Sequence, residues 1–365
     1  MKITFPHMGT LDIILSDLFT RLDVDFVLPP KTTTKAINLG VKYAPEFACF
    51  PLKVTIGNLI EGLEAGADAV VMVGGIGPCR FGFYAEIQNK ILHDMGYDFE
   101  MITLEPPMAD IKDFARKCKK IASKKTLWQI LQAVRIVWKK AVAIDEVERE
   151  VLKRRAFEKN SRDTTVAHKK GLAVLKEAIT PYEIKEAREK ALSLINEVEK
   201  DLRRCPLKIG IVGEFYALLE PYVNFDIEEY LGQKGIYLER AVYLTDWMGP
   251  SKKNSVMGID SDELAKAAKP YLSHFVGGEG QTTVGHIVKF AEEGFDGVIQ
   301  LLPFTCMPEI IAKSVLPKIC KELDIPVLTL IIDEQTGRAG VITRLEAFID
   351  LLWNRRKKKL SAVGC

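Results

Sequence analysis

The 365-residue sequence lacks several patterns that would assign its chemistry directly. It has no C-x-x-C pair, which argues against a zinc knuckle, a rubredoxin-type site and a thioredoxin-type redox pair. It also has no G-x-x-x-x-G-K-[ST] phosphate loop. The glycine run at 74–79 is too short, and too soon interrupted by a cysteine, to be a dinucleotide fingerprint. We therefore expect neither ATP hydrolysis nor nicotinamide binding by this chain.

A strong charge of one sign and long apolar runs are also missing. Lysine and arginine total 51 against 49 aspartates and glutamates, a balance that gives no reason to expect a nucleic-acid partner. No stretch approaches the ~20 apolar residues of a membrane span, and the N-terminus lacks the apolar core of a signal peptide. We expect a cytoplasmic protein with no membrane partner, whose thiols stay reduced. The basic run 355–359 is expected to be a solvated helix end or else a docking patch for an acidic partner.

Short β-rich runs alternate with helix-like segments along most of the chain. The runs lie within 2–9, 24–30, 69–75, 99–107, 207–216, 236–244, 296–304 and 326–333. This alternation is typical of βαβ units, so the fold class we expect is α/β with parallel sheets.

The chain divides into three predicted parts. Residues 1–110 and 206–365 are predicted to be Rossmann-like, flavodoxin-like domains, joined by a mainly helical segment at 111–205 that is rich in lysine, glutamate, alanine and leucine. Within the segment, Thr180, Pro181 and Glu183 predict a helix start with a capping box.

The two predicted domains contain similar sequence stretches. Residues 54–79 align with 282–306, so that Gly57 matches Gly285, Gly66 matches Gly294 and Asp68 matches Asp296. A cysteine follows each stretch at nearly the same distance, in a loop predicted to end a strand. We therefore predict an internal repeat with a cleft between its halves, because loops at the carboxyl ends of parallel strands build binding crevices.

Three of the seven cysteines stand in such loops, namely Cys49, Cys79 and Cys306. Each has a proline within two residues, and a following helix would favour the thiolate, the form that binds metals. A single cysteine of this kind is more often a small core residue. Cys49 has no counterpart in the second repeat, but three cysteines at strand-to-helix loops of matched domains favour an iron–sulfur cluster across the cleft, with one iron left without a protein ligand. The remaining thiols, Cys118, Cys205, Cys320 and Cys365, lie in helices, a junction and the terminus.

Four stretches that include these loops, 43–68, 74–88, 304–319 and 333–350, resemble the 2-hydroxyacyl-CoA dehydratase component family. This family includes benzoyl-CoA-reductase-like subunits and double-cubane cluster proteins. The resemblance covers both predicted sheet domains and looks closest to an uncharacterised branch that is associated with activator ATPases.

The resemblance implies an oxygen-sensitive 4Fe-4S cluster held by Cys49, Cys79 and Cys306. In such proteins a separate ATP-hydrolysing iron–sulfur activator injects a low-potential electron, which the dehydratase uses to form a ketyl radical at an acyl-CoA thioester. It also implies a homo- or heterodimer. A double-cubane cluster is less favoured because the remaining thiols do not lie in matching loops. No coenzyme-A pocket can be mapped onto the sequence, so the substrate is an acyl-CoA or another small molecule.

Several residues near these loops are candidates for further roles. Arg80 is predicted to donate to cluster sulfides or offset their charge, or else to be a helix-start arginine. Glu46 is predicted to act as an acid or base, or to cap the next helix. His7 is a substrate contact or, more often for a lone histidine, a structural residue. The glycines at 277, 278 and 280 suit a close backbone approach to an anion or to the cluster, or a plain turn.

The end of the predicted second domain contains a candidate capping box and three candidate cleft residues. Thr343 is expected to cap a helix with Glu346 as its partner. Glu334, Gln335 and Arg338 are expected at the exit of the preceding strand, facing the cleft.

The function we expect is a low-potential radical or reductive step on a small substrate bound at the open iron. One alternative is a non-catalytic subunit that relays electrons to a partner or acts as a scaffold. The other is a metal-free binding protein whose cysteines are core residues.

Overall fold

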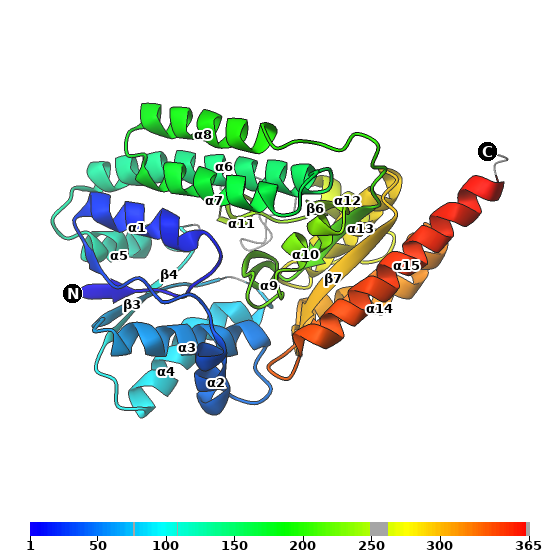
Figure 1. Ribbon diagram of the computed structural model, residues 1–365. Coiled ribbons are helices and arrows are strands. Elements are labelled where there is room, and N and C mark those ends of the chain that lie inside the picture. The colour runs from blue at the N-terminus through cyan, green and yellow to red at the C-terminus, as the bar shows by residue number, and fades with distance from the viewer. Residues whose placement is uncertain (76, 108, 249–261, 363–365) are drawn as a thin grey trace.

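The computed structural model describes residues 1–75, 77–107, 109–248 and 262–362, which form a mixed α/β fold with two four-stranded parallel sheets (Figure 1). All eight predicted β-rich runs contain a strand. The first sheet has the order β2-β1-β3-β4 and the second the order β6-β5-β7-β8. The strands are β1 (Lys2–Thr4), β2 (Asp25–Phe26), β3 (Ala69–Val73), β4 (Glu100–Leu104), β5 (Lys208–Gly213), β6 (Tyr237–Arg240), β7 (Gly297–Pro303) and β8 (Val327–Ile332).

Helices connect the strands of each sheet, as parallel pairing requires. In the first half they are α1 (Leu11–Leu22), α2 (Thr34–Tyr43), α3 (Phe50–Glu64), a 3₁₀ turn η1 (Arg80–Phe83) and α4 (Tyr84–Asp94). In the second half they are α9 (Phe215–Leu219), α10 (Ile227–Gln233), α11 (Leu244–Met248), α12 (Asp262–Ala268), α13 (Gly280–Glu292), α14 (Met307–Glu322) and α15 (Arg338–Ala362). The central strand β7 is buried along its whole length because helices cover both faces of its sheet.

The residues that align in the sequence occupy similar places in the two sheets. Asp68 accepts a hydrogen bond from the backbone nitrogen of Lys2, the first residue of β1, and Asp296 does the same for Lys208, the first residue of β5 at 2.8 Å. In both halves the aspartate therefore joins the start of the first strand to the start of the third.

The aligned glycines also serve the same packing purpose. A Cβ on Gly57 of α3 would collide with the backbone oxygen of Ala36 in α2, and a Cβ on Gly285 of α13 would lie 2.4 Å from the backbone oxygen of Leu264 in α12. Each glycine therefore lets the helix before the third strand pack closely against its predecessor.

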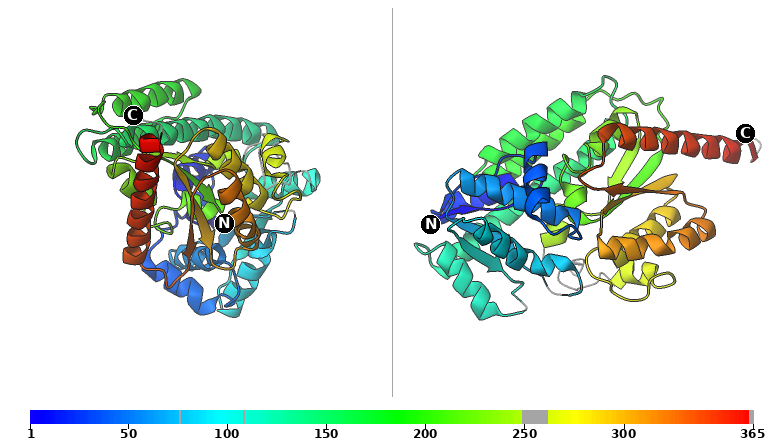
Figure 2. Two further views of the ribbon diagram at one scale, coloured as in Figure 1. Left: turned by 90° about the vertical axis from the view of Figure 1, so that its right-hand side faces the viewer. Right: turned by 90° about the horizontal axis from the view of Figure 1, so that it is seen from below.

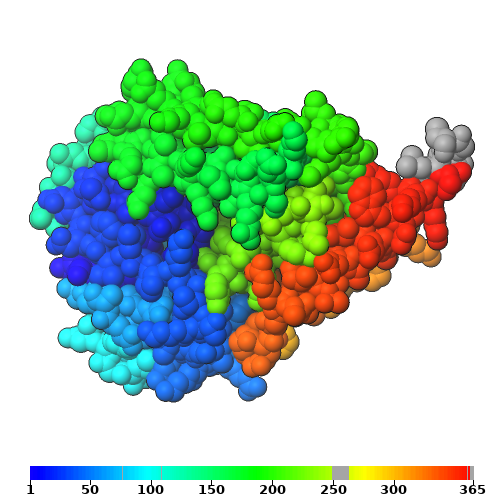
Figure 3. Space-filling model, in the orientation of Figure 1, coloured from blue at the N-terminus to red at the C-terminus, as the bar shows by residue number. Residues whose placement is uncertain are grey.

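The predicted helical segment forms α5 (Ile111–Ile121), α6 (Leu127–Arg155), α7 (Asp163–Glu177) and α8 (Pro181–Asn196). The last three lie side by side as a layer over both sheets (Figures 1 and 3). The largest apolar core joins this layer to both halves, since it includes Ile14 of α1, Ile144 of α6 and Ile209 of β5. The capping box at Thr180 and Glu183 is confirmed.

The long helix α15 runs along the second sheet and extends beyond it (Figure 2). It begins at Arg338, so the capping box predicted at Thr343 and Glu346 is wrong. The Thr343 hydroxyl donates to the carbonyl of Ala339 inside the helix at 3.0 Å, and Glu346 accepts from Tyr230 at 2.7 Å. None of the described helices is both long enough and apolar enough to cross a bilayer.

Candidate functional site

Three cysteines each occupy the position immediately before a helix. Cys49 precedes α3, Cys79 precedes η1 and Cys306 precedes α14. All three have extended backbone angles, and none of their side chains caps its helix by a hydrogen bond. Prolines at the second positions of α3 and α14, where a missing N–H costs nothing, help to start those helices.

The same three cysteines line one cavity of about 600 Å³ of empty space, counted with its opening to solvent. We call it the thiol cavity. Cys49 and Cys79 come from the first half and Cys306 from the second, so both halves build it. The other lining residues are Pro51, Gly75, Phe81, Gly82, Tyr84, Glu214, Phe215, Gly278, Glu279 and Pro308. The structure thus brings together the cysteines that the sequence singled out.

Arg80 ties the three cysteine loops together. Its guanidinium donates to the carbonyl of Phe47, two residues before Cys49, at 2.9 Å, and to the carbonyl of Thr305, next to Cys306. Since Arg80 itself follows Cys79, one side chain links all three loops. Its predicted catalytic role stays a prediction, but the contacts present are those of a positioning residue.

The glycines before α13 allow the second half to approach Cys79. A Cβ on Gly277 would lie 2.7 Å from the Cys79 backbone nitrogen, and Gly277 has a φ of +89°, which favours glycine. A Cβ on Gly278 would lie 3.7 Å from the Cys79 sulfur. The glycines therefore serve the close approach that the sequence suggested, and the neighbour they approach is a cysteine loop.

Burial governs the ionisation of the three thiols. It raises the pKa of Cys79 to about 12 and raises the pKa values of Cys49 and Cys306 as well. For Cys49 this rise is partly opposed by Tyr84, whose hydroxyl lies 2.6 Å from the sulfur, and by Arg80. The prediction that helix starts favour the thiolate is wrong for the protein without a bound cation, because desolvation outweighs the helix ends.

Glu214 is a candidate that sequence reasoning missed. It follows β5, is buried, and accepts a hydrogen bond from the backbone nitrogen of Ala217 at 2.9 Å. Burial raises its pKa to about 7, with a smaller contribution from the nearby Glu309. A carboxyl group that titrates near neutrality beside a cavity can act as a general acid or base. The only signal in the sequence is its place at a strand exit.

An aromatic wall separates the thiol cavity from a larger apolar pocket. Phe215 and Trp247 stack with their centroids 4.3 Å apart, and Phe81 meets both edge-on. Phe81 also contacts Tyr84 edge-on. Beyond this wall lies a pocket of about 910 Å³ of empty space, which we call the apolar pocket, and Glu214 lines both spaces.

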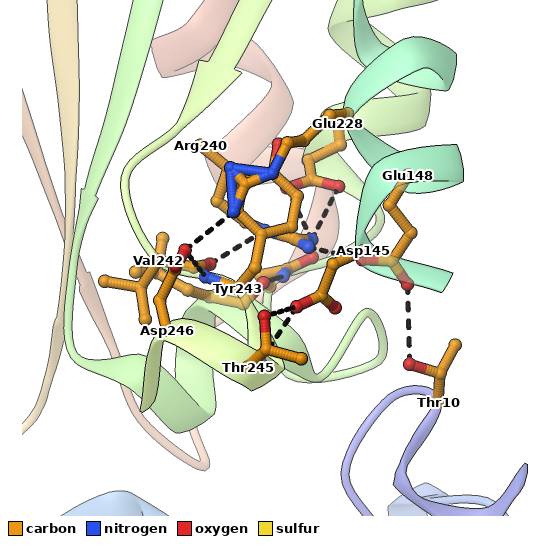
Figure 4. Close-up of polar contacts among 12 residues, drawn as sticks. Thr10, Asp145, Glu148, Glu228, Arg240, Val242, Tyr243, Thr245 and Asp246 are labelled. Atoms are coloured by element: carbon orange, nitrogen blue, oxygen red, sulfur yellow. Dashed lines mark hydrogen bonds and ion pairs between the residues drawn. The ribbon is translucent and has the colours of Figure 1, made fainter. Parts of the chain in front are cut away.

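A polar cluster anchors α11, the short helix that carries Trp247 (Figure 4). Asp145 of α6 accepts from the backbone nitrogen and the hydroxyl of Thr245 at 2.8 and 2.6 Å. Asp246 accepts from Arg149 of α6 at 2.8 Å. These bonds fix α11 to the helical layer and so hold Trp247 in the pocket wall.

Arg240 of β6 forms the buried centre of the same cluster (Figure 4). It donates to Glu228 at 3.1 Å and to Glu148, and its guanidinium stacks on the Tyr243 ring at 4.2 Å. Thr10, at the start of α1, reaches Glu148 at 3.5 Å. The cluster therefore connects both halves to α6.

Two predicted site residues near the start of the chain do not line the thiol cavity. Glu46 is exposed on the turn before Cys49, so its predicted acid or base role stays a prediction without geometric support. His7 is buried, and its Nδ1 lies 2.8 Å from Glu220, which also accepts from the backbone of Gly9 at 2.9 Å. It thus joins the two halves structurally.

The residues predicted at the exit of β8 lie outside the cavity as well. Glu334 accepts from the buried Lys53 of α3 at 2.7 Å. Arg338 donates to the carbonyl of Phe225 at 2.9 Å, and the backbone of Gln335 donates to Asp333 at 3.0 Å. They stabilise the junction of the halves and the local turn.

Among the remaining thiols, Cys118, Cys205 and Cys320 do not line the cavity, and Cys365 lies outside the described residues. Within the described ranges no group of three histidine, cysteine, aspartate or glutamate side chains is arranged to hold a single metal ion. Comparison with protein-family models and with curated proteins gave no match to this chain.

Proposed function

We propose that the chain binds a 4Fe-4S cluster through Cys49, Cys79 and Cys306 and uses it in a reductive or radical step on a small substrate. The observation that carries the proposal is the convergence of three thiols, from helix starts far apart in the sequence, on one cavity. The resemblance to 2-hydroxyacyl-CoA dehydratase components supports the same ligand set.

We infer further that the two halves are flavodoxin-like repeats and that the cluster lies in the cleft between them. The equal strand orders support this, as do the equivalent bonds of Asp68 and Asp296 and the equivalent packing of Gly57 and Gly285. A duplication explains why Cys79 and Cys306 both follow the third strand of their sheets.

The chemistry of the donor set fits such a cluster. Buried thiols with raised pKa values stay protonated unless a cation compensates the thiolate charge, and iron would supply that charge as the protons leave. A cubane places each thiolate on a different iron, so its ligands need not converge as tightly as those of a single ion. When bound, a cluster with an open iron supplies one electron and a Lewis-acid position.

The chain's own residues would prepare the substrate. Glu214 can give or take a proton at the boundary between the thiol cavity and the apolar pocket. Phe81, Phe215 and Trp247 exclude water there, which strengthens polar interactions inside the site. We propose a separate ATP-hydrolysing iron–sulfur activator as the electron donor, because this sequence has no phosphate loop of its own. A dimer and an acyl-CoA substrate remain proposals from the resemblance alone.

Anaerobic reconstitution with iron and sulfide tests the cluster. We expect about four irons and four sulfides per chain, with the iron lost or strongly reduced in Cys49→Ser, Cys79→Ser and Cys306→Ser. Cys320→Ser is the matched control, since this thiol lies in the last turn of α14 and does not line the cavity. Unchanged iron content in both Cys79→Ser and Cys306→Ser would exclude the proposal.

Ligand dependence of the paramagnetic resonance signal separates catalysis from electron relay. A reduced cluster with an open iron should change its signal when a small oxygen or nitrogen ligand is added. A signal that ignores every such ligand would instead support the electron-relay subunit. The apolar pocket beside the thiol cavity favours the enzyme, because a relay needs no substrate pocket.

A further inference from the structure

The apolar pocket continues into a third space on its far side. This space of about 400 Å³ lies between α1, α6 and α11, and it shares Leu15, Leu18 and Met248 with the apolar pocket. At the other end the apolar pocket shares Phe81 and Glu214 with the thiol cavity. The three spaces therefore lie in a row from the thiols to the helical layer, and we call the two apolar spaces beyond the aromatic wall the passage.

The lining of this passage beyond the thiol cavity is hydrocarbon, with few polar groups. Glu214 is the one charged side chain among its described lining residues, and no lysine, arginine or histidine is among them. The hydroxyls of Thr55 and Tyr216 already donate to backbone carbonyls of Pro51 and His7. An anionic ligand would thus meet a carboxyl group and no compensating cation.

Trp247 adds an aromatic face to this lining but no accessible donor. Its side chain lines the apolar pocket and is only 7% exposed, while its Nε1 has neither a hydrogen-bond partner among the described residues nor surface open to the pocket. A ligand in the pocket therefore contacts the indole ring and not its nitrogen.

We propose that the passage binds an uncharged, elongated hydrocarbon chain. The chain lies against the aromatic wall at one end and runs past Leu15 towards α6. The inference rests on the proposed function only in that this ligand would be the substrate presented to the thiol cavity. It adds the substrate's class, which is a neutral molecule with an apolar body long enough to reach from the apolar pocket into the third space.

A series of methyl ketones, from 2-butanone to 2-undecanone, tests the class by calorimetry on the full chain under anaerobic conditions. We expect the affinity to rise about fourfold per added methylene until the passage is filled. Nonanoate, which has a similar body but carries a charge, should bind at least tenfold more weakly than 2-nonanone. An affinity that does not rise with length, or equal binding of nonanoate, overturns the proposal.

Two variants locate the ligand. Leu15→Trp fills the junction between the two apolar spaces, so 2-nonanone should lose at least tenfold in affinity while 2-butanone changes little. Leu351→Trp, on an exposed position of α15, is the matched control. Unchanged 2-nonanone binding by Leu15→Trp overturns the assigned path.

Iron analysis of the same preparations separates this inference from the proposed function. Normal iron content without length-dependent ketone binding overturns the passage alone. Length-dependent ketone binding by a chain that takes up no iron overturns the cluster and leaves the passage as a binding site. Cys79→Ser separates the two proposals in one variant, since it should lose iron and still bind 2-nonanone.

Discussion

Replacing Arg80 with methionine tests whether one guanidinium holds the three cysteine loops together. The arginine donates to the carbonyls of Phe47 and Thr305, which belong to the loops of Cys49 and Cys306. Hydrogen bonds from a charged donor contribute about 1.5–3 kcal/mol each, and Arg80 is half-buried, so the lower end applies. The pair is then worth about 3 kcal/mol, which corresponds to about a hundredfold change in an equilibrium.

The assay is removal of iron from the reconstituted protein by a chelator under anaerobic conditions. We expect Arg80→Met to release iron about a hundredfold more readily than the unmodified chain, and Arg80→Lys to be intermediate because an ammonium lacks the planar fork. Arg356→Met is the control, since Arg356 also donates to two backbone carbonyls, those of Cys205 and Pro206, at 3.1 and 3.0 Å. Equal iron retention in Arg80→Met and Arg356→Met would refute the clamp.

Two further predictions concern contacts between the halves. Gly277→Ala should lower the free energy of unfolding by more than the ~1–2 kcal/mol that left-handed backbone strain costs, because its Cβ would also collide with Cys79. Gly66 has a φ of +91° and no neighbour within 4 Å of an added Cβ, so Gly66→Ala should show the cost of strain alone. Urea titrations measure both. Lys53→Met should lower the free energy of unfolding by about 3 kcal/mol, because it leaves the carboxylate of Glu334 without its cation. Glu334→Gln in the same chain should recover part of that loss. Additive effects of the two substitutions would argue against the buried pair.

The sequence predicted the strands and the cysteine loops because both depend on local patterns. A run such as 297–303 is apolar except for Gln300, and that marks a strand buried on both faces. Cys79 and Cys306 were found because the loop after a parallel strand has a known place in such folds, and because Asp68 and Asp296 fixed the alignment of the halves. Cys49 was singled out by its prolines and the following helix, and the structure places it between α2 and α3, not after a strand.

The sequence could not predict which residues far apart in the chain are partners, or which side chains are buried. Arg80 bonds to backbone carbonyls, which leave no trace in residue identity. Glu214 precedes a five-residue helix, so its pattern indicates an ordinary cap, and its burial depends on the opposite half. The thiol prediction was wrong because the helix ends were visible in the sequence while the desolvation that outweighs them was not. Thr343 failed as a cap because its helix starts five residues earlier.

Asp145 gives the pocket wall a predicted dependence on pH. Its pKa is raised from 3.8 to about 6, mainly by burial and also by the neighbouring Glu148, while the bonds from Thr245 and the charge of Arg240 partly oppose the rise. One carboxyl oxygen has no partner among the described residues, which also favours the protonated form. Because the folded-state pKa is raised, the folded protein holds a proton between about pH 4 and pH 6 that the unfolded chain has released.

The stability contributed by this site therefore falls as pH rises through that window, and the loss is complete above about pH 6. The two pKa values correspond to about 3 kcal/mol at most. Asp145→Asn keeps an oxygen for Thr245 and removes the charge, so its free energy of unfolding should match the unmodified chain near pH 4 and exceed it by up to about 3 kcal/mol near pH 8. Urea titrations at both pH values measure the difference. If Asp145→Asn and the unmodified chain differ in unfolding free energy by the same amount at pH 4 and pH 8, the charge of Asp145 does not destabilise the contacts that hold α11. The position of Trp247 would then be independent of pH.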